Sequence, residues 1–338
     1  MSEELLEKNG SGQVETRSSA GTRFIKWATQ YLGQIGFLAI LLVLLFLTSP
    51  AFGTPNNLIN VARQVSINMI LSCAMTMVLI VGGIDLSVGA VMALSGMVSA
   101  FLSLSGVPFG ICALAGIAAG MVAGLVNGII LSNTNLPPFI VTYAVQNIIR
   151  GLVYVITGAG TIRLTSEAYL EFGGGSLGPV PLPVIYMVII VVLSIVLLSR
   201  TRFGRHMYAL GGNPKAARFA GINTARLTLL IYTISGALAG FAGLVLTSRN
   251  SSMQPSVGSG AEMDAIAAVV LGGTSMLGGR GAIFGTILGA FIIGFINNGL
   301  NMLGMDSFYQ YIAKGVVILI AVYMDYIKNR SLTKGTQE

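Results

Sequence analysis

The sequence of 338 residues contains few charged residues, cysteines and histidines, and each shortage excludes a class of protein. Only 9% of the residues are charged, whereas about a quarter are charged in an ordinary soluble domain. The two cysteines, Cys73 and Cys112, lie within apolar runs, so they indicate neither a disulfide framework nor a zinc site. The only histidine, His206, lies beside Arg205 in a basic stretch. We therefore expect no metal site.

Two further features that enzymes and carriers use are missing. The sequence has no G-x-x-x-x-G-K-[ST] loop, which in nucleotide hydrolases holds the phosphates, so we expect this chain not to be an ATPase and to hold no cofactor of its own. Acids are also scarce in the apolar part of the chain. Between residues 32 and 324 the acids are Asp85, Glu167, Glu171, Glu262, Asp264 and Asp306. Most of them lie at the ends of apolar runs, unlike the acids embedded in proton-coupled carriers.

What the sequence has in abundance is long apolar runs. Apolar residues make up 54% of the chain, and the mean hydropathy is +0.81. A helix needs roughly 20 apolar residues to cross the hydrocarbon of a bilayer. Nine runs are candidates, at residues 31–48, 65–81, 88–104, 109–131, 139–157, 182–199, 227–247, 282–303 and 308–326. The sequence therefore predicts an all-α polytopic membrane protein, with a transmembrane domain over residues 31–326.

The net charge of +7 arises mainly from basic residues outside the apolar runs. They cluster in residues 200–226 and in the two ends of the chain, which is typical of cytoplasmic segments of membrane proteins and does not require nucleic acid as a partner. Residues 1–30 are polar and lack the apolar core of a secretory signal. We expect them to form a disordered cytoplasmic tail, and residues 327–338 to form a second cytoplasmic tail.

The charge distribution also predicts a tenth crossing. Six spans bring a cytoplasmic N-terminus back inside at residues 200–226, but three further full spans would leave the basic C-terminus outside. Residues 263–272 are apolar yet too short for a full span, and a glycine-rich stretch follows them. We expect a short or broken helix here, buried in protein or lining a cavity. Residues 157–181 then lie outside, as a solvated loop or as a surface for an external partner.

A short helix is predicted inside the basic segment 200–226, which contains six basic residues and no acid. Asn213 is a favoured N-cap, Pro214 suits the first helical position and Gly221 suits the turn after the helix. So short a helix is unstable alone, so it must pack on the membrane helices or on a partner, although a helix lying on lipid headgroups remains an alternative. The candidate residues for coupling to an ATPase are Asn213, Pro214, Lys215, Ala216, Ala217, Arg218 and Gly221.

Several polar residues at or inside the apolar runs are candidates for a gate or a path. A charge at the bilayer centre costs about 2.5–3.5 kcal/mol, so Asp85 either caps the following helix, serves as a structural acid of a gate, or binds the solute. Glu262 and Asp264 precede the broken helix and fit its start. Candidates for lining a path are Asn127, Asn297, Asn298 and Asn301, although hydrogen bonds between helices explain them equally well. Glycines at every fourth position of 116–128 predict close helix packing.

Several blocks of this sequence resemble one known family. Lys215-Ala216-Ala217 followed by Gly221 resembles the EAA-xxx-G coupling motif of permease subunits of ATP-driven importers, with lysine in place of the first glutamate. Residues 81–94, 201–223 and 261–290 resemble the ribose-type monosaccharide permeases. The resemblance implies a homodimer of ten-helix subunits in a bacterial inner membrane, surrounded by lipid. It also implies a cytoplasmic ATPase that binds ATP and Mg, and a periplasmic sugar-binding protein.

The expected function is that of the membrane-spanning subunit of an ATP-driven importer for a monosaccharide, with ribose first by resemblance. The alternative is a stand-alone sugar carrier or facilitator driven by a gradient, which would transport without any partner. The scarcity of acids in the apolar runs favours the importer.

Overall fold

The computed structural model describes residues 20–305 and, near the C-terminus, residues 309, 310, 312, 315, 316, 319 and 323. The described chain is helical, with a few two-residue strands. The helices are α1 (Ala20–Thr48), α2 (Pro55–Ile80), α3 (Val88–Leu104), α4 (Phe109–Asn133), α5 (Pro138–Thr157), α6 (Glu167–Gly174), α7 (Leu182–Arg200), α8 (Arg202–Gly212), α9 (Pro214–Phe219), α10 (Thr224–Arg249), α11 (Ala261–Leu271) and α12 (Ile283–Met302). The strands are β1 (Ile162–Arg163), β2 (Ser176–Leu177), β3 (Val180–Pro181) and β4 (Ser252–Met253).

The prediction of a polytopic all-helical membrane protein is confirmed. Among the described residues, 7 helices are long and apolar enough to cross a membrane, and α3 is a shorter apolar helix of 17 residues. Two boundaries are corrected. Helix α1 begins at Ala20, so residues 20–30 are helical and do not belong to a disordered tail, and α2 begins at Pro55, ten residues before the expected span. Most of the predicted last span, 308–326, lies outside the described residues.

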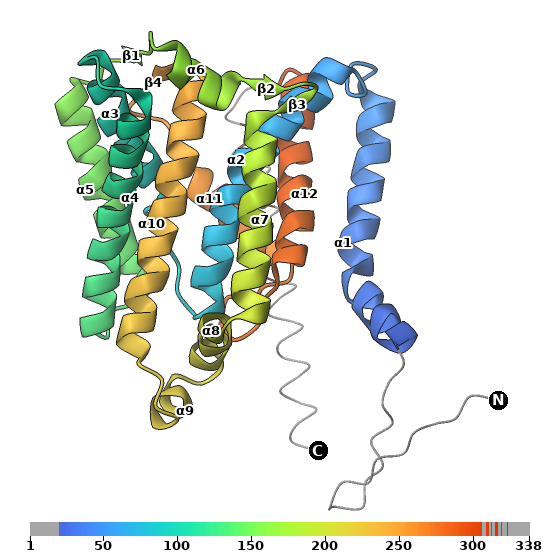
Figure 1. Ribbon diagram of the computed structural model, residues 1–338. Coiled ribbons are helices and arrows are strands. Elements are labelled where there is room, and N and C mark those ends of the chain that lie inside the picture. Colours follow the sequence, from blue (N-terminus) through green and yellow to red (C-terminus); the bar gives the residue numbers. More distant parts are fainter. Residues whose placement is uncertain are drawn as a thin grey trace, which may run out of the picture.

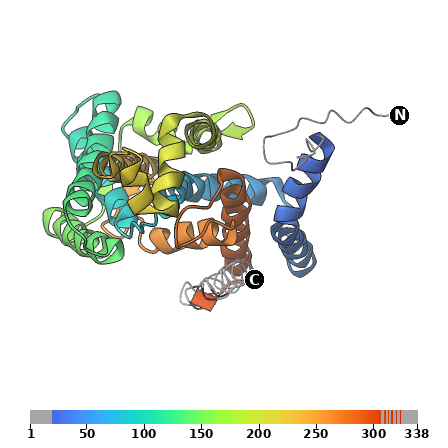
Figure 2. The same cartoon turned by 90° about the horizontal axis from the view of Figure 1, so that it is seen from below.

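The long helices stand side by side in one bundle (Figure 1). Helix α2 is its centre and is buried along most of its length, because α7, α10, α11 and α12 all pack against it. Helix α10 also packs along α3 and α4. Helix α1 lies at the periphery, as both views show (Figures 1 and 2). It contacts α12 and is mostly exposed. Such an exposed apolar surface is what a lipid-facing helix requires.

Different connecting segments lie at the two ends of the bundle, and α7 runs directly from one end to the other (Figure 1). At one end lie α6, the hairpin of β2 and β3, and the antiparallel pair of β1 and β4. At the other end lie α8 and α9, which cover the ends of the long helices when seen from below (Figure 2, yellow). The basic segment 200–226 is therefore opposite to residues 157–181.

Helix α11 carries the chain from one end of the bundle to the other. Before it, Met253 of β4 pairs with Ile162 at the end that holds α6. After it, the Gly279 amide donates a hydrogen bond of 2.8 Å to the Ile80 carbonyl at the end that holds α8. Because α11 has only 11 residues, the rest of this distance is covered by irregular chain. This agrees with the expected short helix.

The predicted glycine packing joins α4 to α10. A Cβ atom on Gly120 would lie 2.4 Å from the Gly236 carbonyl oxygen, and one on Gly124 would lie 2.1 Å from the Tyr232 carbonyl oxygen. The two backbones are therefore in direct contact, which only glycine permits at these positions.

Candidate functional site

The predicted short helix is present as α9, and local contacts fix its position. The Asn213 side-chain oxygen accepts hydrogen bonds from the Lys215 amide at 3.1 Å and the Ala216 amide at 3.0 Å, as an N-cap does. Gly221 follows the helix with a φ of 80°, a conformation that favours glycine. Ala217 is buried, and the Arg218 guanidinium donates to the Thr224 hydroxyl at 3.0 Å. Six residues would not hold this shape alone.

The most exposed large apolar side chain among the described residues is on α9. Phe219 is 92% exposed, at the last residue of the helix. Lys215 and Arg218 are also exposed. Sequence reasoning missed Phe219 because it concentrated on the small and basic residues of the motif. The available signal was an aromatic residue directly before a helix-ending turn in a segment that is otherwise polar.

Helix α8, which precedes α9, was not predicted, since its residues were expected to form part of a loop. The Thr201 hydroxyl caps it by accepting from the Gly204 amide at 3.1 Å. Helix α8 buries Met207 and Leu210 under the bundle. The Tyr208 hydroxyl donates a hydrogen bond of 2.8 Å to the Gly281 carbonyl, and burial raises the pKa of this hydroxyl above its ordinary value. The amphipathic spacing of the apolar residues in 202–212 was the signal that could have identified α8.

Asp85 lies in the connection between α2 and α3, buried to 1% exposure. One carboxylate oxygen accepts from the Ser87 amide at 3.0 Å and the Ser87 hydroxyl at 2.6 Å, and the other accepts from the Ser235 hydroxyl of α10 at 2.7 Å. The Asn127 amide of α4 donates to the Ser87 hydroxyl at 2.8 Å. Asp85 therefore stabilises the turn that begins α3 and ties this turn to α4 and α10.

The other two candidate acids begin α11 and point to different neighbours. Glu262 is buried, and one of its oxygens lies 2.3 Å from where a Cβ atom on Gly89 would be, so it packs on the first turn of α3. Its charged neighbours are the Arg150 guanidinium of α5 and the Asp264 carboxylate. Asp264 faces α12, where it accepts a hydrogen bond of 3.2 Å from the Asn297 amide.

The four candidate path asparagines do not form one group. Asn127 is linked to Asp85 through the Ser87 hydroxyl. Asn297 lies beside Asp264, while Asn298 exchanges two hydrogen bonds with Asn57 of α2, at 2.8 and 3.1 Å. The Asn301 side-chain oxygen accepts from the Gln310 amide at 2.6 Å.

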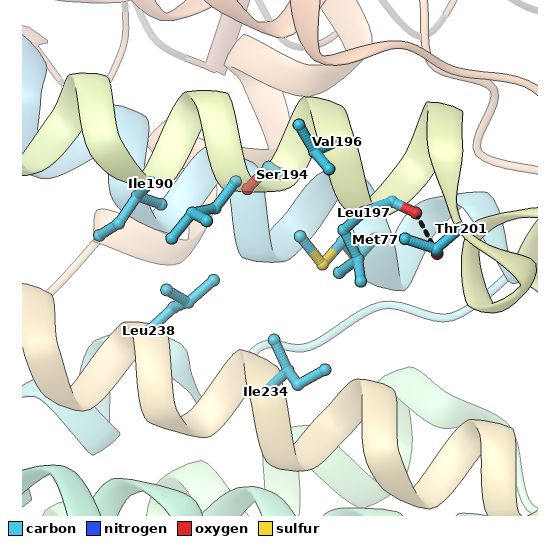
Figure 3. Close-up of a pocket in the computed structure, with 9 residues that line it drawn as sticks. Met77, Ile190, Ser194, Val196, Leu197, Thr201, Ile234 and Leu238 are labelled. Atoms are coloured by element: carbon cyan, nitrogen blue, oxygen red, sulfur yellow. Dashed lines mark hydrogen bonds between the residues drawn. The ribbon is translucent and has the colours of Figure 1, made fainter.

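A cavity of about 320 Å³ lies between α2, α7 and α10 (Figure 3). Its walls are almost entirely apolar, with Met77, Ile234 and Leu238 facing the space. Of its two hydroxyls, that of Thr201 is already bonded to the Leu197 carbonyl at 2.6 Å. A sugar needs several convergent polar groups, so this cavity is not a sugar site.

The known proteins that resemble this chain are permease components of transport systems. Residues 57–322 match the family described as branched-chain amino acid transport system, permease component. The ribose import permease protein RbsC of Bacillus subtilis is 46% identical over 89% of this chain and 94% of its own length. The D-allose transport system permease protein AlsC of Escherichia coli is 40% identical over 87% of this chain and 90% of its own. The L-arabinose ABC transporter permease protein AraH of Azospirillum brasilense is 34% identical over 89% and 90%. No solved structure gives a significant match.

Proposed function

Because the chain belongs to the family of transport-system permease components, we propose that it is the permease of an ATP-driven importer for ribose or a closely related monosaccharide. The observation that carries this proposal is the capped helix α9, which presents the exposed Phe219 side chain at the basic end of the bundle. Relatives that are named for ribose, allose and arabinose support the sugar class. ATP and Mg are bound by the partner ATPase that a permease component requires.

The proposed topology has ten crossings, with α11 as the short one and with both termini in the cytoplasm of a bacterial inner membrane. It is supported by the positions of the helix ends. Helix α1 begins at the end of the bundle that holds α8 and α9 (Figure 1), and the basic segment 200–226 lies there too. That end is therefore assigned to the cytoplasm by the excess of Lys and Arg in cytoplasmic loops.

The opposite end is the proposed contact for a periplasmic sugar-binding protein. Its exposed surface includes Glu167, Glu171 and the apolar Leu177, which is 70% exposed. Helix α6 of this surface is tied to the bundle, since the Ser248 hydroxyl of α10 accepts from the Gly173 amide at 2.6 Å. Contacts that hold a surface in place before binding lower the conformational entropy lost when a partner docks.

Two copies of the chain are proposed to enclose the path, with Asp264 and Asn297 as a polar part of its wall. In support, Asp264 is only partly buried and Met263 beside it is 41% exposed, so this region borders the outside of the subunit. Glu262 and Asp85 are structural acids in this proposal, because Glu262 packs on the first turn of α3 and Asp85 accepts a hydrogen bond from the Ser87 amide directly before it. The asparagines at 127 and 298 are proposed to hold helices together.

The test is the change Phe219→Ala in the complex with its ATPase. Burying a phenylalanine side chain contributes about 1.5–3 kcal/mol, so we expect ATPase binding to weaken about tenfold to a hundredfold, with loss of ATP hydrolysis stimulated by the binding protein. The matched control is Leu177→Ala, which removes an exposed apolar side chain at the opposite end and should leave ATPase binding intact. Unchanged affinity in the Phe219 variant would contradict the docking assignment.

The rival function is a stand-alone carrier, and it makes a different prediction. Proteoliposomes that contain this chain alone should then accumulate or equilibrate ribose without ATP or any partner. The importer predicts uptake only when the ATPase, ATP and binding protein are all present.

A further inference from the structure

Three chain segments meet through backbone contacts at the C-terminal end of α8. A Cβ atom on Gly211 would lie 1.8 Å from the Ile80 carbonyl oxygen and 2.5 Å from the Gly279 amide nitrogen. A Cβ atom on Gly278 would lie 2.9 Å from the Gly82 nitrogen and 3.0 Å from the Gly211 carbonyl oxygen. Such distances leave no room for any side chain. We call these five residues the glycine junction.

Hydrogen bonds hold the junction together. The Gly279 amide donates to the Ile80 carbonyl at 2.8 Å, and the Tyr208 hydroxyl of α8 donates to the Gly281 carbonyl at 2.8 Å. The turn that contains Gly278 and Gly279 is closed by the Ser275 amide, which donates to the Arg280 carbonyl at 3.1 Å. Helix α8 is therefore bonded to the turn, and the turn to the end of α2.

Two of the three segments at the junction lead to short apolar helices. Residues 81–87 lead to α3, whose first turn is tied to α10 through Asp85 and Ser235. The turn after α11 leads back to α11 itself. The two short helices meet again at their N-terminal ends, where Glu262 packs on Gly89. The contacts thus connect α8 to α3 and to α11, and connect α3 and α11 to each other.

We propose that Gly211 is a positioning residue for transport, because its close contact makes α8, residues 81–87 and the turn 272–281 move as one unit. Since α9 follows α8 directly, a displacement of α9 by the ATPase would shift the starts of α3 and α12 and the end of α11 together. This inference rests on the proposed contact between α9 and the ATPase. In this proposal the displacement of α9 is passed to the helices around the path through backbone contacts, which do not depend on any ionisable side chain.

The test compares two adjacent glycines in the complete complex, reconstituted in liposomes. Gly211→Ala forces a methyl group into the Ile80 carbonyl, whereas Gly212→Ala meets nothing within 4 Å. We expect the Gly211 variant to retain ATPase binding and ATP hydrolysis but to lose sugar uptake, and the Gly212 variant to match the parent in all three. Uptake coupled normally to hydrolysis in the Gly211 variant would overturn the proposal. Normal ATPase binding in Phe219→Ala would instead refute the docking of α9, so the two failures are distinguishable.

A second measurement applies if Gly211→Ala does not fold. Gly212→Cys with Arg280→Cys places thiols on two exposed positions that each lie next to a junction residue, and the chain's own cysteines are buried. Position 280 follows Gly279, whose added Cβ would lie 2.9 Å from the Gly212 Cα atom, so a short reducible bismaleimide spans the pair. If the junction moves as one unit, the cross-linked complex keeps its uptake. Loss of uptake that returns when the linker is reduced would show that the segments move apart, and would overturn the proposal.

Discussion

Replacing Asp85 should show that its main contribution is structural. In Asp85→Ala, the Ser87 amide and the Ser235 hydroxyl lose their buried acceptor, while the Ser87 hydroxyl loses one hydrogen bond and keeps the one from the Asn127 amide. Each buried polar group left without a partner costs about 1–3 kcal/mol, so the free energy of unfolding should fall by about 2–6 kcal/mol. Asp85→Asn keeps one acceptor oxygen for the Ser87 amide, and its new NH₂ group can donate to the Ser235 hydroxyl. This variant should lose only about 1 kcal/mol, the net value of a typical hydrogen bond.

The assay is unfolding of the purified chain in mixed micelles by titration with a denaturing detergent, without ATPase, binding protein or sugar. Ser235→Ala serves as the control, because it removes one hydrogen bond and leaves the two from Ser87 in place; its cost should lie between those of the two Asp85 variants. A loss below about 0.5 kcal/mol in Asp85→Ala, which is the range of an ordinary surface substitution, would refute the structural role. Sugar uptake lost without loss of stability would indicate a direct role in the gate.

Two further predictions concern helix packing. Gly124→Val should prevent stable assembly of α4 with α10, because its Cβ atom would lie 2.1 Å from a backbone oxygen of α10. The control is Gly110→Val on the same helix, where an added Cβ atom meets nothing within 4 Å. This control should leave the stability unchanged in the same detergent titration. A double-mutant cycle with alanine at Asn57, at Asn298 and at both tests the pair between α2 and α12. The double variant should be more stable than the sum of the two single losses predicts, because each single change leaves a bonded amide without its partner. Exact additivity, or a change of sugar preference in the Asn298 variant alone, would argue that Asn298 lines the path.

Local sequence signals were sufficient for α9. An N-cap asparagine, a proline at the first helical position and a glycine after the last turn act within a few residues of one another, so their effect can be read from the sequence. The same holds for the long apolar helices, because the membrane demands length and apolarity from each helix separately. The short helix α11 was predicted from the number of membrane crossings. The basic segments fix which side of the membrane each loop occupies, and nine full spans would leave the basic C-terminus on the wrong side.

The arrangement of the polar residues could not be predicted in the same way. Asn127, Asn297 and Asn298 look alike in the sequence, since each lies in an apolar helix near glycines. What separates them is the partner that packing brings to each: Ser87, Asp264 and Asn57 respectively. Partners at such sequence distances follow from the order in which helices pack around α2. No local pattern encodes that order.

The glycine junction explains how two breaks in the helical structure are tolerated at the end of the bundle that holds α8: residues 81–87 between α2 and α3, and the irregular chain between α11 and α12. Interruption leaves backbone amides and carbonyls without helical partners, and in lipid each of these must be satisfied by protein. The Ile80 carbonyl at the end of α2 is satisfied by the Gly279 amide from the other interruption. Each break therefore supplies what the other lacks, but only if the two backbones approach closely, which requires glycine at both. Helix α8 can reach the same point only because Gly211 lacks a side chain. A substitution at any one of these glycines should thus disturb both breaks together, which is the behaviour expected of a single mechanical unit.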